Sequence, residues 1–345
     1  MSCHQAYRSS VRHRALIVIA AAIVLAVLFV LDLAVGSSDI TVPRALAALA
    51  AGPGGESIDA VIIWSIRLPM TLTALFVGTA LALAGLEIQN ITANALASPS
   101  TLGISSAASF GAALSITLGF TVLGQTWLGT AACAFCLALL VSTAVFWIGS
   151  RESMHPATLI LAGIVMNFFF MALQQFLQYR ASPEVAQVIS GWTFGNLERS
   201  TWTSTAVAGV TTLAAALYLV RRSWALTALT VGEERARSLG VPVTRLRVEV
   251  FAASSLLVAA AVGFVGTIGF VGLVAPHCAK LVLGEDQRFL LPGTIFSGGM
   301  LMLASSVTAK SLSTGAMLPV GIITSLVGVP FLLFLLLKTR REGFA

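Results

Sequence analysis

Residues that could do chemistry are few in this sequence, and the most concentrated group lies in the segment 231–247. There Glu233 and Glu234 are followed by two arginines, and the charged run ends at Gly240. Acidic residues at the start of a helix and basic residues near its end suit the helix dipole, and a glycine followed by proline is typical of a helix end. The segment therefore predicts a short charged helix, which either connects two elements or docks into a soluble partner.

Amide side chains form a stripe in a long apolar stretch. Asn167, Gln174, Gln175 and Gln178 fall at positions i, i+7, i+8 and i+11, which places them on one face of a helix. Such a stripe lines a polar path or forms hydrogen bonds between helices. We predict that it lines a polar path.

A second polar group lies near the end of another apolar stretch and comprises Glu87, Gln89 and Asn94. An ionisable residue within a membrane span is by default a functional candidate. We predict that these three residues form a gate at the cytoplasmic end of the apolar stretch at 61–84.

Groups for catalysis are missing from the sequence. It contains neither the G-x-x-x-x-G-K-[ST] loop that binds nucleotide phosphates nor the H-E-x-x-H pattern that binds zinc. Cys133 and Cys136 form a C-x-x-C pair, but they lie in an apolar stretch without a second pair to complete a zinc site. We therefore expect no catalytic residue, no metal site and no cofactor in this chain, which should not hydrolyse ATP by itself.

The elements that must position these residues are membrane spans. The 345 residues are 57% hydrophobic and only 10% charged, with a mean hydropathy of +0.93, whereas soluble domains carry about 25% charged residues. Apolar runs of about 20 residues, the length that crosses a bilayer, recur along the chain. We predict an all-α polytopic membrane protein with about ten spans, near 15–35, 61–84, 101–122, 127–149, 157–179, 203–220, 248–268, 271–283, 289–309 and 317–337.

The span at 271–283 is too short to cross a hydrocarbon layer of about 30 Å. Glycines and prolines, among them Gly266, Gly269 and Pro276, interrupt the apolar sequence around it. A broken helix persists in a membrane only where its freed backbone groups face protein or a water-lined cavity. This region is therefore either part of the working centre or a glycine-lined packing surface.

The basic residues predict the orientation of the chain. With ten spans and a cytoplasmic N-terminus, fifteen of the 20 Lys and Arg residues fall inside, as the positive-inside rule requires. The five outside are Arg44, Arg67, Arg180, Arg199 and Lys310. We predict a multi-pass protein of the cell (inner) membrane with both termini in the cytoplasm. It comprises a tail at 1–14, one transmembrane domain at 15–338 with a cytoplasmic loop at about 224–247, and a tail at 339–345.

Several motifs, taken together, resemble the iron-chelate and cobalamin permease family of ABC importers. They are Arg67-Leu-Pro69, Asn94-Ala-Leu-Ala-Ser-Pro99 with Leu102-Gly103, the loop at 231–247, the segments 269–277 and 284–292, and 318–324 with 328–330. Each alone is only a pattern of glycine and proline. Their order and spacing over about 61–338 make the set specific.

The resemblance implies a type II ABC importer permease fold. Two permease subunits, as a homodimer or a heterodimer, would enclose a translocation path within the membrane lipid. Two cytoplasmic ATPase subunits, which use ATP and Mg, and an external substrate-binding protein would complete the importer, without nucleic acid. The family's coupling helix, which contacts the ATPase, matches Glu233, Glu234, Arg235, Ala236, Arg237, Leu239 and Gly240. The family receives acidic residues of the binding protein on basic residues, and Arg67 and Lys310 lie at matching positions, although both could instead anchor span ends.

We predict on this basis the permease subunit of an importer for a ferric siderophore or a similar iron chelate. Haem, cobalamin and an oxyanion such as molybdate are alternatives within the same fold. An ion-coupled secondary transporter would need carboxylates within its spans, in which this chain is poor. A membrane enzyme would need a metal or nucleophile cluster, which the sequence does not show.

Overall fold

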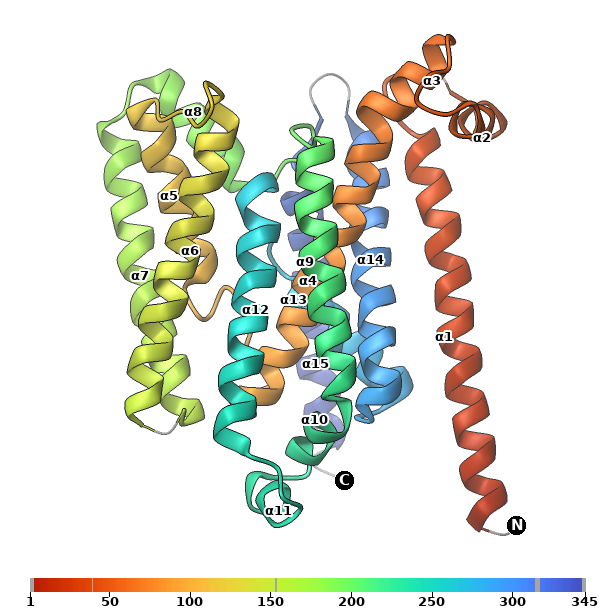
Figure 1. The fold of residues 1–345 in the computed structure, drawn as a ribbon, viewed down its shortest axis with the longest axis vertical. Coiled ribbons are helices and arrows are strands. Elements are labelled where there is room, and N and C mark those ends of the chain that lie inside the picture. Colours follow the sequence, from red (N-terminus) through yellow and green to blue (C-terminus); the bar gives the residue numbers. More distant parts are fainter. Residues whose placement is uncertain (1–2, 39, 153, 314–316, 343–345) are drawn as a thin grey trace.

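The computed structural model describes residues 3–38, 40–152, 154–313 and 317–342 (Figure 1). The described residues form helices and connecting turns without a β-strand. The elements are α1 (Cys3–Ala34), α2 (Val42–Ala51), α3 (Ile58–Ile62), the π-helical segment η1 (Ile63–Arg67), α4 (Leu68–Thr92), α5 (Ile104–Leu118), α6 (Thr126–Arg151), α7 (Pro156–Arg180), α8 (Pro183–Thr193), α9 (Trp202–Arg221), α10 (Ser223–Thr230), α11 (Glu233–Ser238), α12 (Val243–Val265), α13 (Val271–Leu283), α14 (Gln287–Leu312) and α15 (Val320–Glu342).

The predicted count of about ten spans is confirmed. Seven helices in the described part are long and apolar enough to cross a membrane by length and composition, and α5, α13 and α15 are shorter apolar helices beside them. The Cys3 end of α1 and the Glu342 end of α15 lie at the same end of the bundle as α11 (Figure 1), as an even number of crossings requires. We call this end the α11 end, and the opposite end, where α2, α3 and α8 lie, the α2 end.

Several helices begin or end where the predicted spans do not. The predicted tail at 1–14 is helical from Cys3 onwards, because neither glycine nor proline interrupts α1 before residue 34. The predicted tail at 339–345 likewise continues α15 as far as Glu342. In contrast, α5 is shorter than the predicted 101–122, because Gly103 and Gly119 adopt left-handed conformations, with φ of 74° and 63°, at its two ends.

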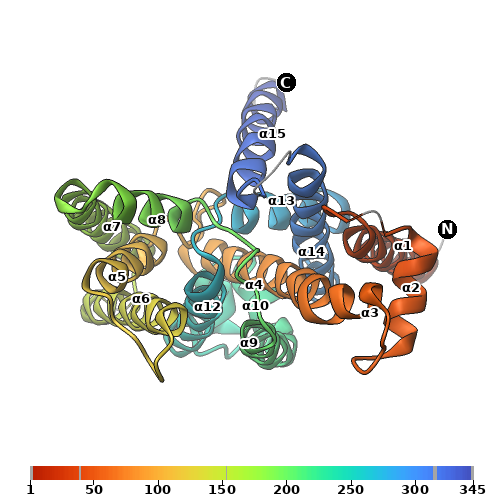
Figure 2. The ribbon, with the colours of Figure 1, turned by 90° about the horizontal axis from the view of Figure 1, so that it is seen from above.

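The core is built around α4, which lies centrally in Figure 2 and is buried along nearly all of its length. Glycines allow other helices to approach its backbone. A Cβ added at Gly85 would lie 1.7 Å from the backbone oxygen of Gly272 in α13, and one added at Gly78 would lie 2.5 Å from that of Gly298 in α14. Small residues at a helix crossing let two backbones approach closely, so these two contacts determine where α13 and α14 cross α4.

The predicted break in the helical sequence is confirmed at 266–270. Helix α12 ends at Val265, and α13 has the predicted bounds, 271–283. The freed backbone groups face protein, since Asn196 N donates to Val265 O at 2.8 Å and a Cβ at Gly266 would lie 2.0 Å from Trp192 O. The break thus packs against the end of α8, and it satisfies the requirement that irregular backbone at membrane depth be covered.

Candidate functional sites

Helix α11 protrudes from the bundle between α10 and α12 (Figure 1). Glycines lie on both sides of it, Gly232 with φ of 115° and Gly240 with φ of 82°, and these conformations favour glycine over residues with a side chain. Ala236 is fully buried. Within 231–240, the two glycines are exposed together with Val231, Glu234, Arg235, Arg237, Ser238 and Leu239. The structure thus presents a charged surface with two large apolar side chains, Val231 and Leu239, exposed by 54% and 58%.

Glu233 differs from the other charged residues predicted for coupling because it forms an ion pair with α12. Its Oε2 lies 2.9 Å from Nη2 of Arg247 in α12, and its Oε1 lies 2.7 Å from Nη2 of Arg237. The hydrogen bond from Arg237 lowers the pKa of Glu233 from its ordinary value of 4.5, and the charge of Arg247 adds to this effect. A lowered pKa means that the carboxylate stabilises the fold at neutral pH and loses this contribution only as the pH falls below 4.5 and through the lowered pKa.

A second ionic cluster joins the end of α9 to the first turns of α12. Glu249 Oε2 accepts hydrogen bonds from Tyr218 Oη at 2.5 Å and from Arg222 Nη2 at 2.8 Å. Its Oε1 accepts from Arg245 Nε at 2.9 Å. This end of α12 is therefore tied to its neighbours by two carboxylates, Glu233 from α11 and its own Glu249.

A recess of about 620 Å³ lies between the end of α8, the break at 266–270 and α15. The residues that line it are Thr193, Phe194, Thr267, Gly269, Gly321, Ile322, Ser325, Leu326, Val329 and Pro330. Hydroxyl groups and apolar side chains form this lining, which carries no charged side chain among the described residues. The recess can therefore accept a bulky, weakly polar molecule without holding it by charge.

Close backbone contacts form one wall of this recess. The hydroxyl of Thr267 donates to the backbone oxygen of Thr193. A Cβ added at Gly321 would lie 2.2 Å from Phe194 O, and one added at Gly195 would lie 2.7 Å from Thr267 O. The end of α8, the break and the start of α15 are thus packed together through their backbones.

The amide stripe of α7 makes contacts with neighbouring helices. Gln174 Nε2 donates to Thr193 Oγ1 at 3.0 Å and Gln178 Nε2 to Ser190 Oγ at 2.7 Å, both in α8. The hydroxyl of Ser106 donates to Asn167 Oδ1. None of the four amides lines the recess, although Gln174 supports a residue that does. These three contacts are hydrogen bonds between helices, which is the alternative that the sequence left open. Gln175 is exposed. That the stripe lines a path stays a prediction.

The predicted gate residues do not form one cluster in the structure. Glu87 and Gln89 are buried within α4. Among the described residues, the amide of Gln89 has no hydrogen-bond partner for its oxygen or its nitrogen, and Oε1 of Glu87 has none either. Glu87 Oε2 accepts from Asn90 at 3.3 Å. Asn94 lies beyond the helix end, where its Oδ1 accepts from Leu96 N at 2.9 Å. None of the three lines the recess, and their role as a gate stays a prediction.

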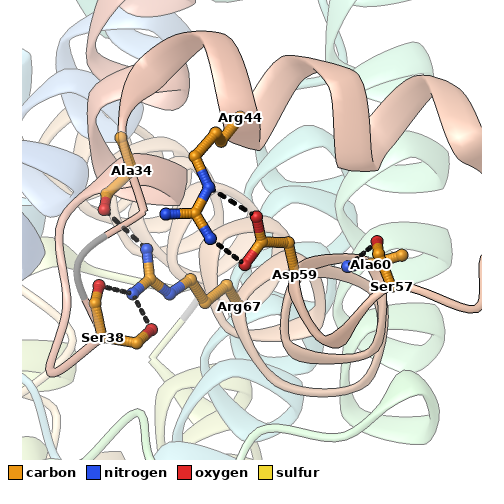
Figure 3. A network of polar contacts seen from close by, with 7 residues as sticks. All are labelled: Ala34, Ser38, Arg44, Ser57, Asp59, Ala60 and Arg67. Carbon is orange, nitrogen blue, oxygen red and sulfur yellow. Dashed lines mark hydrogen bonds and ion pairs between the residues drawn. The ribbon is translucent and has the colours of Figure 1, made fainter.

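Arg67, predicted to receive the binding protein, is only 5% exposed at the α2 end. Figure 3 shows its guanidinium directed at Ala34, the last residue of α1, and at Ser38 beyond it. Nη1 donates to the backbone oxygens of Leu33 at 2.8 Å and Ala34 at 2.6 Å. Nη2 donates to the backbone oxygen and the hydroxyl of Ser38, each at 2.7 Å. Beside it, Arg44 of α2 pairs with Asp59 through two bonds of 2.8 Å.

Lys310, the other predicted docking residue, is equally buried. Its Nζ lies 2.8 Å from Oδ2 of Asp32 in α1 and donates to the Asp32 backbone oxygen at 2.8 Å. Thr71 of α4 donates to the same carboxylate at 2.5 Å. The geometry of Lys310 and Arg67 favours the alternative interpretation, the anchoring of helix ends, because docking to another protein needs exposed charges. Docking itself stays a prediction.

Several residues that the structure brings into these sites could not be identified from the sequence. Arg247 was counted only as a cytoplasmic charge, and Val231 only as the first residue of the loop. Thr193, Thr267 and Ser325 come from segments far apart in the sequence. No local pattern could have identified these three, since the recess exists only once α8, the break and α15 are packed together.

Comparison with known proteins agrees with this architecture. The FecCD transport family matches residues 24–338 of the chain. The cobalamin import system permease protein BtuC of Halobacterium salinarum is 37% identical over 277 residues, which cover 80% of this chain and 73% of that protein. The hemin transport system permease protein HmuU of Yersinia pestis is 36% identical over 286 residues, which cover 81% and 84%.

A solved structure described as an inward-facing ABC transporter of the metal-chelate type has the same fold. It superposes with a TM-score of 0.82 at 32% identity and covers 93% of this chain and 99% of the other. The family match extends over most of the chain, and the resemblance seen in the sequence motifs is confirmed. The chain therefore belongs to the FecCD transport family, and it is a permease of an ABC importer.

Proposed function

We propose that this permease moves a ferric siderophore or a similar iron chelate into the cytoplasm, powered by a separate ATPase and supplied by an external binding protein. The observation that carries the proposal is the uncharged recess at α8, the break and α15. A large chelate that encloses its iron presents organic surface, which hydroxyl and apolar side chains can contact without trapping it by charge. In this proposal iron is the cargo and not a cofactor of the permease.

A second permease subunit would close the translocation path. Helix α15, which lines the recess, and α7, whose Gln174 bonds to the lining residue Thr193, both carry large exposed apolar side chains. They are Phe168, Phe169 and Phe176 of α7 and Leu326, Val329 and Leu333 of α15. A second copy or a similar permease, packed against α15, would cover the open side of the recess and complete a channel around the cargo.

The α11 end would face the cytoplasm, with both termini on that side of the cell (inner) membrane. The exposed face of α11 would fit a groove on the ATPase, with the apolar side chains of Val231 and Leu239 at its two ends. Two ATPase subunits, one for each permease, would supply the nucleotide chemistry for which this chain's sequence has no phosphate-binding loop.

The α11 contact can be tested with Leu239→Glu, which places a charge where an apolar side chain is 58% exposed. Burying an unpaired charge in an interface is costly, so we expect the amount of copurified ATPase to fall at least about tenfold, a loss of about 1.4 kcal/mol. Leu118→Glu is the matched control, since Leu118 is 71% exposed at the end of α5. Equal retention of the ATPase by Leu239→Glu and the unmodified chain would contradict docking through α11.

The recess can be tested with Ser325→Trp, which fills space lined by Thr193, Thr267 and Ile322. We expect ATP-dependent uptake of a 55Fe-labelled hydroxamate siderophore into proteoliposomes to fall at least about tenfold, because a bulky chelate could no longer pass. The ATPase should still copurify, since the substitution is remote from α11. Unchanged uptake would exclude the recess as part of the path.

Haem and cobalamin are the second candidate cargoes, because the two relatives described above are named for hemin transport and cobalamin import. The same uncharged lining would suit the planar porphyrin ring of haem or the corrin ring of cobalamin. Uptake of cobalamin or haem in the absence of siderophore uptake would keep the importer and replace its cargo.

A further inference from the structure

The ionic contact between Glu233 and Arg247 lies where a movement of α11 would enter the membrane-spanning bundle. Arg247 is only 5% exposed, and Glu233 of α11 supplies its one ion-pair partner among the described residues, at 2.9 Å. Nε of Arg247 has no hydrogen-bond partner in the part of the chain that the structure describes. The guanidinium of Arg247 therefore depends on α11 for the compensation of its buried charge, and a buried charge without a partner is strongly unfavourable.

Helix α12 connects this contact directly to the recess. It is a single helix of 23 residues, about 35 Å long at 1.5 Å per residue, with Arg247 in its first turns. Its other end at Val265 receives the hydrogen bond from Asn196. Two residues later, Thr267 lines the recess and donates to Thr193 O. The stretch from Arg247 to Val262 contains neither glycine nor proline. It therefore has no proline or glycine at which the helix would bend and absorb a displacement.

We propose that Glu233 and Arg247 are positioning residues that lock α11 to α12, so that movement imposed on α11 is transmitted along α12 to the wall of the recess. This inference rests on the proposed function and deepens it, because it assigns the element that links ATPase closure to the path. The cluster of Tyr218, Arg222 and Glu249 holds the same end of α12 to α9.

The flanking glycines explain why such a lock is needed. Helix α11 is joined to α10 through Gly232 and to α12 through Gly240. Glycine restricts the backbone dihedral angles less than other residues do, so α11 could rotate at these two positions. A push on α11 would otherwise be dissipated by rotation at these two positions. Helix α11 also packs against α10, and the buried Ala236 and the bond from Val241 N to Ala236 O at 3.0 Å hold its turn together. The Glu233–Arg247 pair therefore provides the direct charged connection between the two helices.

The test uses a thiol at the recess as a reporter of transmitted movement. The Ser325→Cys variant, with Cys3, Cys133, Cys136 and Cys278 replaced by serine, is assembled with its ATPase and binding protein in proteoliposomes. A membrane-impermeant maleimide then labels position 325 in the presence or absence of ATP and vanadate. In this background we expect nucleotide trapping to change the labelling rate about tenfold, within the range typical of coupling between distant sites.

Glu233→Gln and Arg247→Gln are each expected to reduce this nucleotide-dependent change to less than about twofold, and the double variant to add no further loss. Arg247→Lys, which keeps the charge but not the guanidinium geometry, should restore part of the response. The matched control is Glu285→Gln, which removes a carboxylate 3.8 Å from Lys280 at the same end without touching α11. It should keep the full change.

Copurification of the ATPase separates transmission from docking. It should persist in Arg247→Gln, because Arg247 is buried in α12 and the side chains on the exposed face of α11 are retained. Glu233→Gln keeps the shape of the side chain and removes only its charge. A full tenfold response in this variant would overturn the lock while leaving the proposed function intact. No response to nucleotide in the parent background, with the ATPase bound, would overturn the transmission of movement to the recess and the proposed function together.

Discussion

Replacing Lys310 with methionine is expected to lower the free energy of unfolding by about 3–5 kcal/mol, the usual cost of leaving one partner of a buried ion pair alone. The carboxylate of Asp32 is fully buried, and its Oδ1 accepts no hydrogen bond from any described residue of the unmodified chain. Without Lys310, its Oδ2 would keep only the hydroxyl of Thr71. Thermal and denaturant unfolding of the purified protein in detergent would measure the loss.

A second lysine provides the control for this prediction. Lys280 lies 3.8 Å from Glu285, whose side chain is 60% exposed, and Lys280→Met should cost less than about 1 kcal/mol because exposed pairs contribute little. The double variant Asp32→Asn with Lys310→Met should recover much of the stability lost by Lys310→Met alone. Similar destabilisation by the two lysine substitutions would show that the Asp32 pair does not anchor α1.

Gly85→Ala is expected to destabilise the fold by at least about 3 kcal/mol, the upper end of the usual range for over-packing. The new Cβ would lie 1.7 Å from Gly272 O and 2.4 Å from Gly272 C. These are backbone atoms of α13, so no rotation of a side chain relieves the clash. We expect α13 to be displaced from α4, together with the break at 266–270 that precedes it, and uptake to be lost with it.

Gly191→Ala is the matched control for Gly85→Ala. Gly191 lies within α8, and a Cβ there would meet nothing within 4 Å. Alanine favours a helix over glycine by about 1 kcal/mol, so this substitution should leave stability unchanged or raise it slightly. If both substitutions had the same small effect in unfolding experiments, the close crossing of α4 and α13 would be wrong.

The sequence predicted the class of fold well because the bilayer imposes a simple requirement. Spans of about 20 apolar residues and an excess of basic residues at one side need no knowledge of packing. The half-length helix at 271–283 was also found, because glycine and proline mark a break locally. The bounds of α1 and α5 were less accurate, since a helix can continue beyond the membrane and a glycine can end it early.

The candidate sites were harder to predict, for a physical reason that Lys310 and Arg67 illustrate. Hydropathy places a charge near a span end but does not say whether its side chain points outwards or towards another helix. Both side chains turn inwards, Lys310 to Asp32 and Arg67 to the end of α1 and to Ser38 beyond it. Glu233 shows the same difficulty within α11, because its direction depends on Arg247, which is 14 positions away across a turn.

The central claim is tested most directly by uptake into proteoliposomes that contain this permease, its ATPase and its binding protein. The cargo is a 55Fe-labelled hydroxamate siderophore, supplied outside with the binding protein, and ATP is enclosed or omitted. We expect iron to accumulate only when ATP and the binding protein are both present. Accumulation driven by an ion gradient in the absence of ATP would contradict the account.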